Sequence, residues 1–460
     1  MYTIHFDHPI HVHFIAIGGI SMSGLAEILL EAGFTISGSD SKKSELTDRL
    51  EEQGAKVFLG QRASNIIDGI DLVVYSAAIK EDNPEYAEAV RRGIPMLTRA
   101  QLLGEIMTNY KMPVAISGTH GKTTTTSMIS QILMENKCDP TITVGGMLES
   151  IGGNIRVGRS DYFVTEACEY TNSFLSFFPK IAIILNIEED HMDFFKDLDD
   201  IRHSFKRFAQ LIPEEGSLII NGDIDNVSEI YEGVKGQVVT FGLSDGSDYS
   251  AKDITFDGLA HPSYNLLYKG SDTGIRITLS VPGEHNVLNS LAAIAFSRAV
   301  GLSYEEAAAG LKAFTGTDRR FQYKGKLGGI TIMDDYAHHP SEIKATLTAA
   351  KKCDNKRIVV TFQPHTYSRT KAFLEDFAKA LSLADIVVLA DIYAAREKNT
   401  YNISSEDLLR VLQSIGVESY YFPSFDEIEN FLLQNCTEGD LLITMGAGDI
   451  VNVGEHLLGK

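Results

Sequence analysis

The sequence is short of basic residues. It has 41 lysines and arginines against 62 aspartates and glutamates, so the formal charge is −21 over 460 residues. A surface of that sign repels a phosphate backbone, so we expect no nucleic-acid partner. An anionic ligand would need a local group of donors.

Cysteines and long apolar segments are also scarce. The four cysteines are widely separated and form no CxxC pair, which argues against a disulfide framework or a zinc site and fits reduced thiols in a cytoplasm. No stretch approaches 18 uninterrupted apolar residues, and residues 1–19 lack the pattern of a signal peptide. We therefore expect a cytoplasmic protein with no membrane partner. The oligomeric state stays unknown at this stage.

The chain alternates strand-like runs with helical patterns. A strand predicted at 12–17 precedes a helix at 21–33 that Gly33 ends, and a second strand follows at 35–40. Short β-branched runs between helices are typical of βαβ units with a parallel sheet. The length corresponds to about three domains.

The middle of the chain has a different pattern. Residues 263–281 hold two alternating runs around a Gly/Ser/Asp turn, which predicts a hairpin and a mixed sheet. After residue 322 the βαβ pattern resumes with four more strand candidates. We place domain boundaries near residues 111 and 317.

The segment VAISGTHGKTTTTSM, residues 114–128, joins a predicted strand to a predicted helix. Gly118 and Gly121 let backbone N–H groups face an anion, and the helix dipole adds positive charge there. Lys122 supplies a charge for the β- and γ-phosphates, and the Thr123 hydroxyl suits Mg²⁺. The loop is shorter than the standard form, which has four residues between its glycines. The alternative is a glycine-rich turn with a chance lysine.

Further oxygen ligands follow two predicted strands. Glu166 ends the run 162–166, and the segment EEDHMD, residues 188–193, follows the run 181–184. Carboxylates at such strand ends suit Mg²⁺. The alternative is a solvated acidic turn, and His191 would be an unusual magnesium ligand.

The first strand leads into a glycine-rich turn. Gly18 and Gly19 follow it, Gly24 lies in the next helix, and Asp40 ends the second strand. The strict GxGxxG spacing is not met. A nicotinamide dinucleotide, a different diphosphate nucleotide and tight strand–helix packing remain alternatives.

The last third of the chain gathers polar side chains at predicted strand ends. A lone histidine is usually a packed or surface residue, but several together with arginines offer donors for phosphates and a carboxylate. The candidates are Arg319, Arg320, Asp334, Asp335, Tyr336, His338, His339, His365, Tyr367, Arg369 and Lys371.

With these motifs in view, the chain resembles the Mur ligases of bacterial cell-wall synthesis. The matching segments, in family order, are IGGISMSGLAEIL, SGTHGKTTTT, EACEYTNSFL, NIEEDHMD, GEHNVLNSLAA, DRRFQ, DDYAHHPSEI, QPHTYSRT and DIYAARE. The resemblance implies an α/β protein of three domains. They are an N-terminal Rossmann-like domain for a UDP-sugar (1–111), a central P-loop-type ATPase with a mixed sheet (112–317) and a C-terminal Rossmann-like domain for an amino acid (318–460).

The resemblance also implies roles for individual residues. The UDP-sugar site would comprise Gly18, Gly19, Ser21, Asp40, Ser76 and His365. The ATP site would comprise Gly118, Thr119, His120, Gly121, Lys122, Thr123, Thr124, Asn286, Asn289, Arg319 and Asp334. Magnesium ligands would be Thr123, Glu166 and His191, and the catalytic residues would be Lys122, His338 and Arg369.

The implied reaction uses ATP and Mg²⁺ to activate a carboxylate as an acyl phosphate, which an amine then attacks. We cannot place the lysine that relatives adding later residues carbamylate, which favours UDP-N-acetylmuramate and L-alanine as substrates. His338 or an acidic neighbour is a hypothesis for the base. The alternatives are a ligase that attaches a recycled peptide to the same sugar, a nicotinamide oxidoreductase, and a nucleotide-gated binding protein.

Overall fold

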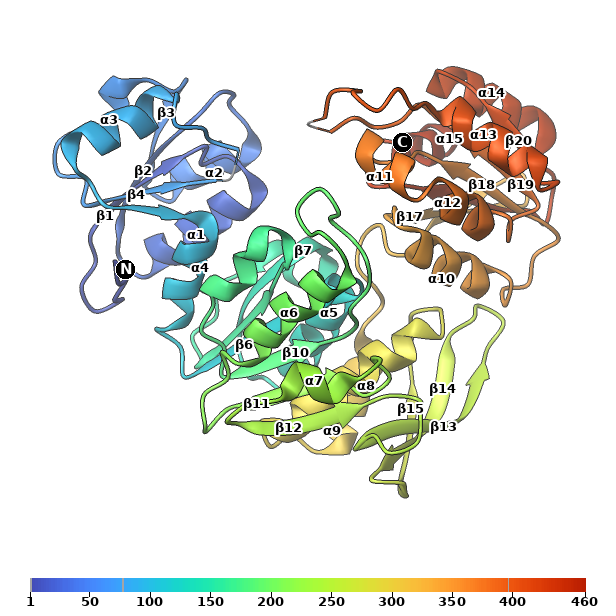
Figure 1. Cartoon of the computed structure of the whole chain (residues 1–460), viewed down its shortest axis with the longest axis horizontal. Helices are drawn as coiled ribbons and strands as arrows, with labels where there is room; N and C mark the ends of the chain where they lie inside the picture. The colour runs from blue at the N-terminus through green and yellow to red at the C-terminus, as the bar shows by residue number, and fades with distance from the viewer. Residues whose placement is uncertain (1, 77, 396) are drawn as a thin grey trace. The chain divides into compact units, whose positions relative to one another are not determined.

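The computed structural model describes residues 2–76, 78–395 and 397–460 (Figure 1). Arg396, part of the motif at 391–397, lies outside the described residues. The chain divides into two compact units: unit 1 is Met1–Glu188 with Leu198–Thr240, and unit 2 is Glu189–Asp197 with Phe241–Lys460. Within the described ranges, the helices are too short or too polar to cross a membrane.

Unit 1 begins with a parallel sheet of strand order β3-β2-β1-β4-β5. The chain builds outward from β1 to β3 and then returns to β4, so the strand order reverses between β1 and β4. Gly33 follows the first helix with a φ of +84°, a conformation that suits glycine and ends the helix as predicted. The elements are β1 (His11–Ile15), α1 (Ile20–Glu31), β2 (Thr35–Asp40), α2 (Glu45–Glu52), β3 (Lys56–Leu59), η1 (Ala63–Asn65), β4 (Leu72–Tyr75), α3 (Pro84–Arg92), β5 (Met96–Thr98) and α4 (Arg99–Met107).

The second sheet has ten strands, and its part from β6 to β12 has the strand order β12-β11-β10-β6-β9-β7-β8. Strands β11, β10, β6, β9 and β7 run parallel, and β8 is antiparallel to β7, so the sheet is mixed, as predicted. The elements are β6 (Met112–Ser117), α5 (Lys122–Glu135), β7 (Thr141–Leu148), η2 (Glu149–Ile151), β8 (Gly153–Arg156), β9 (Tyr162–Glu166), η3 (Tyr170–Ser176), β10 (Ile181–Ile184), α6 (Leu198–Ala209), β11 (Ser217–Asn221), α7 (Val227–Tyr231) and β12 (Gln237–Phe241).

Unit 2 contains the predicted hairpin. Strand β14 (Pro262–Tyr268) pairs antiparallel with β15 (Ser271–Thr278), and β13 (Tyr249–Phe256) pairs with β14. The turn residues Lys269 and Gly270 both have positive φ, which is the geometry of a tight hairpin. Helices α8 (His285–Ala299) and α9 (Tyr304–Ala313) follow.

The C-terminal sheet of unit 2 has the strand order β16-β17-β21-β18-β19-β20 and is parallel except for β16. The four predicted strands are β17, β18, β19 and β21. The elements are β16 (Gln322–Leu327), β17 (Ile330–Asp335), α10 (Pro340–Ala350), β18 (Ile358–Phe362), α11 (Tyr367–Ala372), α12 (Leu374–Leu381), β19 (Ile386–Leu389), α13 (Ser405–Ser414), β20 (Glu418–Tyr421), α14 (Phe425–Asn435), β21 (Leu441–Met445) and α15 (Val451–Leu457).

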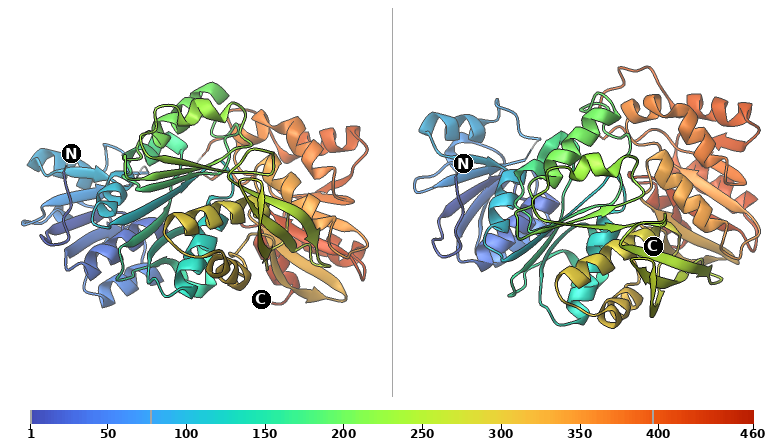
Figure 2. Two further views of the ribbon diagram at one scale, coloured as in Figure 1. Left: turned by 90° about the horizontal axis from the view of Figure 1, so that it is seen from below. Right: turned by 60° about the horizontal axis from the view of Figure 1, so that its bottom comes forward.

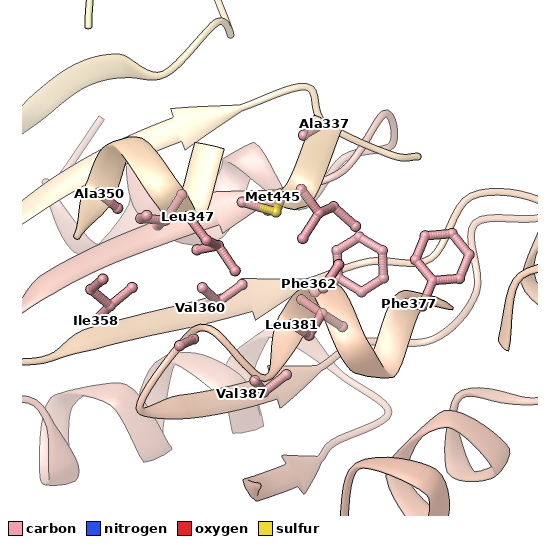
Figure 3. Packing of buried hydrophobic residues seen from close by; sticks show 14 of the residues in the cluster. Ala337, Leu347, Ala350, Ile358, Val360, Phe362, Phe377, Leu381, Val387 and Met445 are labelled. Carbon is pink, nitrogen blue, oxygen red and sulfur yellow. The ribbon is translucent and has the colours of Figure 1, made fainter. Parts of the chain in front are cut away.

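Helices cover both faces of this C-terminal sheet (Figure 2). Alternate residues of β18 point to opposite faces. Val360 and Phe362 belong to a core that includes Leu347 of α10 and Phe377 of α12 (Figure 3). Val359 belongs to the core on the other face, which α14 and α15 complete. Helices on both faces of a mainly parallel sheet make this part Rossmann-like, as predicted.

Candidate active site

The predicted phosphate loop connects β6 to α5, and β6 lies between β10 and β9 in the sheet. Gly118 and Gly121 have φ values of +142° and +83°, which favour glycine. A Cβ on Gly118 would also lie 2.9 Å from the Cβ of Leu185. Helix α5 starts after Gly121 without a side-chain cap, so its first N–H groups remain available for an anion.

The segment after β10 forms hydrogen bonds with the same loop. The side chain of Asn186 accepts from the His120 N–H at 2.8 Å and donates to the His120 carbonyl at 3.0 Å. The Glu188 N–H donates to the Thr119 hydroxyl at 2.9 Å. Thr119 and His120 are therefore held by hydrogen bonds from the neighbouring strand end, which fixes the shape of the loop.

The side chain of Lys122 is largely shielded from solvent, and its ammonium group donates hydrogen bonds to three residues. Its ammonium donates to the carbonyls of Gly118 and Thr119 and lies 3.0 Å from the carboxylate of Glu169. Burial alone would lower the pKa of Lys122, but the charge and hydrogen bond of Glu169 together with Cys168 and Glu166 outweigh burial, and the pKa is raised. Glu169 is not among the predicted site residues, although it stands three residues after Glu166 in the segment EACEYTNSFL.

Glu166 ends β9 beside the strand that precedes the phosphate loop, in register with Ile116. Its carboxylate accepts a hydrogen bond from the Gly145 N–H at 2.5 Å. Thr123 is the second residue of α5 and is 8% exposed, and its side chain carries a hydroxyl. Oxygen donors of this kind fit Mg²⁺. His191, the third predicted ligand, belongs to unit 2.

The threonine run divides into two parts. Thr123 and Thr124 lie at the start of α5, next to the loop. Thr125 and Thr126 are fully buried, and among the described residues their hydroxyls have no hydrogen-bond partner. Only the first two threonines are therefore exposed to any extent for phosphate or metal contacts.

The predicted UDP-sugar residues gather at the carboxyl edge of the first sheet. Gly18 and Gly19 follow β1 and Ser76 follows β4, so they flank the point where the strand order reverses, which is where open α/β sheets bind ligands. The Gly18 N–H donates to the carboxylate of Asp40 at 2.9 Å. A Cβ on Gly18 would lie 2.9 Å from that same carboxylate oxygen, so a larger residue would have to shift the side chain of Asp40.

Gly24 has a packing role in unit 1. A Cβ built on it would lie 1.4 Å from Cδ1 of Ile155 in β8, so the side chain of Ile155 fills the space that glycine leaves. Of the alternatives considered for this glycine-rich segment, tight packing accounts for Gly24.

A charged cluster in unit 2 joins the segment after β10 to α11. Arg369 donates to Asp190 at 3.0 Å and also contacts Nδ1 of His365 at 3.3 Å. Burial favours the neutral form of Asp190, but Arg369, His191 and His339 outweigh it and hold the pKa of Asp190 well below its usual range. Asp190 lies in the acidic segment 188–193 that was considered for Mg²⁺, but its pairing with Arg369 was not predicted.

The tautomers of His338 and His365 follow from their partners. Nδ1 of His338 lies 3.0 Å from the Tyr336 carbonyl, which can only accept, so Nδ1 carries the proton and Nε2 the lone pair. Nδ1 of His365 faces the Arg369 guanidinium, which can only donate, so the proton of His365 is on Nε2. The two rings lie 5.7 Å apart. Burial lowers the pKa of each to about 4, so both are neutral at pH 7.

The remaining predicted ATP residues lie in unit 2 and pair with one another. Arg319 binds Asp334 at 3.0 Å and donates to two carbonyls in the loop after β21. Burial raises the pKa of Asp334 against the effect of Arg319. Asn289 donates to Asn286 at 3.0 Å on α8. These contacts tie the start of the C-terminal part to its sheet, and an ATP contact for them stays a prediction.

Comparison with known proteins matches the whole chain. Residues 11–111 match the model described as Mur ligase family, catalytic domain, residues 116–297 the Mur ligase middle domain, and residues 319–448 the Mur ligase, glutamate ligase domain. A UDP-N-acetylmuramate–L-alanine ligase of Agathobacter rectalis is 62% identical over 460 residues, covering all of both chains.

Solved structures of similar ligases also match nearly the whole chain. The UDP-N-acetylmuramate–alanine ligase of Thermotoga maritima is 30% identical with a TM-score of 0.80, covering 98% of each chain. A murein peptide ligase of Psychrobacter arcticus is 26% identical with a TM-score of 0.70, also covering 98% of each chain.

Proposed function

Because the chain belongs to the Mur ligase family, we propose that it is an ATP-dependent ligase that joins the carboxylate of UDP-N-acetylmuramate to the amine of L-alanine, giving ADP and phosphate. The observation that carries the proposal is full-length similarity, at 62% identity, to a relative with that name. The intact loop around Lys122 supports it. The sequence's prediction of a cytoplasmic location belongs to the same proposal.

The proposed domains are 1–111 for the UDP-sugar, 112–317 for ATP and 318–460 for the amino acid. The breaks between matched family segments, at 111–116 and 297–319, support these limits. The edge carrying Gly18, Gly19, Ser21, Asp40 and Ser76 would hold the sugar nucleotide, and His365 would meet its acid.

In the first chemical step, a carboxylate oxygen of the sugar attacks the γ-phosphorus of ATP, and the bond to the β-phosphate oxygen breaks. The product is an acyl phosphate, with ADP as leaving group. Negative charge gathers on the transferring group, and Lys122 stabilises it while the amides of α5 position the phosphates. Mg²⁺, when bound by Thr123, Glu166 and His191, would neutralise further phosphate charge.

In the second step, the amine of L-alanine attacks the acyl carbon and phosphate leaves. The amine loses a proton, and His338 suits the base because it is neutral and its Nε2 carries the lone pair. His365 would donate from Nε2, and Arg369, beside it, would bring positive charge to the reacting acid.

The test is an assay of phosphate release with ATP, UDP-N-acetylmuramate and either single amino acids or a tripeptide, with the product identified by mass. We expect release with L-alanine and a product heavier by one alanyl residue. Release with the tripeptide alone would favour the peptide-recycling ligase. ATP binding without substrate-dependent release would favour a binding protein, and a thermal shift with NAD but not UDP-sugar would favour an oxidoreductase.

A further inference from the structure

Arg99 is a cation without an acidic partner. It is the first residue of α4 and directly follows β5, at the carboxyl edge of the N-terminal sheet. Among the residues that the structure describes, its guanidinium makes one hydrogen bond, to the Ser21 hydroxyl at 3.0 Å, and no ion pair. Other arginines of unit 1 differ: Arg49 binds Glu27, and Arg91 binds Glu88.

The surroundings of Arg99 disfavour its charge. Burial lowers the pKa of Arg99, and the carboxylates that would compensate are missing from its described neighbours, in a chain with a formal charge of −21. An arginine has five N–H donors, and Ser21 takes one. A partly desolvated guanidinium with unused donors is suited to a bound anion.

Ser21 places this cation beside the glycine-rich turn. It lies in the first turn of α1, three residues after Gly18, and α1 and α4 lie side by side (Figure 1). Helix α1 starts without a side-chain cap and has no acidic residue in its first turn. An anion at the reversal point between β1 and β4 would therefore meet backbone N–H groups and the Arg99 guanidinium together.

We propose that Arg99 binds the diphosphate of the sugar nucleotide and that Ser21 orients its guanidinium for that contact. The planar fork of arginine matches two phosphate oxygens. The proposal rests on the proposed function for its ligand, but it concerns binding alone. Arg99 thus adds a site residue to those that the sequence predicted for the UDP-sugar.

The test is calorimetric binding of UDP to the full chain. Arg99→Gln, which keeps a polar side chain but shortens it and removes the charge, is expected to weaken UDP binding about 10- to 100-fold, the loss typical of a charge-assisted contact. Arg99→Lys should recover part of the affinity. Ser21→Ala should weaken binding about 2- to 10-fold. Arg91→Gln, which removes an arginine with a carboxylate partner, is the matched control and should bind as the wild type does.

Binding of different ligands shows whether Arg99 contacts the diphosphate or the carboxylate of the sugar. UMP, which lacks the second phosphate, should be less sensitive to Arg99→Gln than UDP. If the variant binds UDP normally but UDP-N-acetylmuramate weakly, the cation serves the carboxylate and the proposal is wrong; unchanged binding of both also overturns it. In the ligase assay, the KM for the sugar should rise with little change in kcat. Wild-type UDP binding without ligase activity would refute the proposed function and leave this inference standing.

Discussion

The ammonium of Lys122 lies 3.0 Å from the carboxylate of Glu169, in a pair shielded from solvent on both sides. The other hydrogen bonds of Lys122 go to carbonyls of its own loop. A phosphate that accepts an N–H from Lys122 competes with these acceptors, and Glu169 is the charged one among them.

Replacing Lys122 by methionine should stop catalysis and also destabilise unit 1. Phosphate release should fall by at least about 100-fold, because a preorganised charge at the transferring group is lost. The free energy of unfolding should drop by about 3 kcal/mol, since Glu169 is left buried without its partner. The double variant Lys122→Met/Glu169→Gln should regain stability in thermal unfolding without regaining activity. Product formation by the single variant at the wild-type rate would refute the role of the loop.

Replacing Glu169 alone by glutamine should tighten nucleotide binding. The neutral amide still accepts a hydrogen bond from Lys122 but no longer competes as an anion, so the Kd for ADP should fall about tenfold, the effect of roughly 1.4 kcal/mol. The matched control is Asp161→Asn, because Asp161 pairs with Lys111 at the same 3.0 Å but in an exposed position. Weaker ADP binding by Glu169→Gln would mean that Glu169 holds the lysine ready for the nucleotide.

His338 should act as a base over the whole neutral range. Its pKa of about 4 means that it is neutral above pH 5 and loses its lone pair only as the pH falls toward 4. The acid limb of kcat/KM for alanine should therefore show no midpoint near 6.5 from this group. His338→Gln should lower kcat by about 100-fold or more at pH 7.5. Full activity of that variant across the pH range would remove His338 from the reaction.

Glu166 should set the magnesium requirement. Chelation of divalent cations should abolish phosphate release, and Glu166→Gln should raise the Mg²⁺ concentration for half-maximal rate at least about tenfold, because a charged oxygen ligand is lost. Glu232→Gln, which removes an exposed carboxylate paired with Lys206, serves as control. An unchanged Mg²⁺ titration for Glu166→Gln would exclude it as a ligand.

The fold was predictable because its signals are local. Alternating β-branched and helical runs gave the strands β6, β9, β17 and β18 and the helices after them, and glycines with positive φ stand where turns were expected. Strand ends in turn located Glu166 and Lys122. Strands β16 and β20, by contrast, are partly exposed and carry no buried apolar run to mark them.

The missed site residues depend on contacts between distant segments. Glu169 meets Lys122 across 47 positions, and Asp190 meets Arg369 across 179. Spacing along the chain cannot reveal such pairs, because each depends on how distant segments fold together. Lys122 and Glu169 follow the neighbouring strands β6 and β9 of one sheet, whereas Asp190 and Arg369 follow strands of two different sheets. The tautomer of His338 likewise depends on the Tyr336 backbone carbonyl, and the position of a backbone carbonyl cannot be predicted from residue types.

Gly24 allows a last test, which separates packing from ligand binding. Gly24→Ala would place a methyl group where Ile155 now lies, at a cost of about 1–3 kcal/mol in the free energy of unfolding. Shortening the partner in the double variant Gly24→Ala/Ile155→Ala should recover part of that loss, since the new methyl group then occupies the space that Ile155 vacates. UDP affinity should change little in the double variant, because Gly24 lies beyond the first turn of α1. Loss of UDP binding that Ile155→Ala does not relieve would show instead that the backbone at Gly24 approaches the nucleotide.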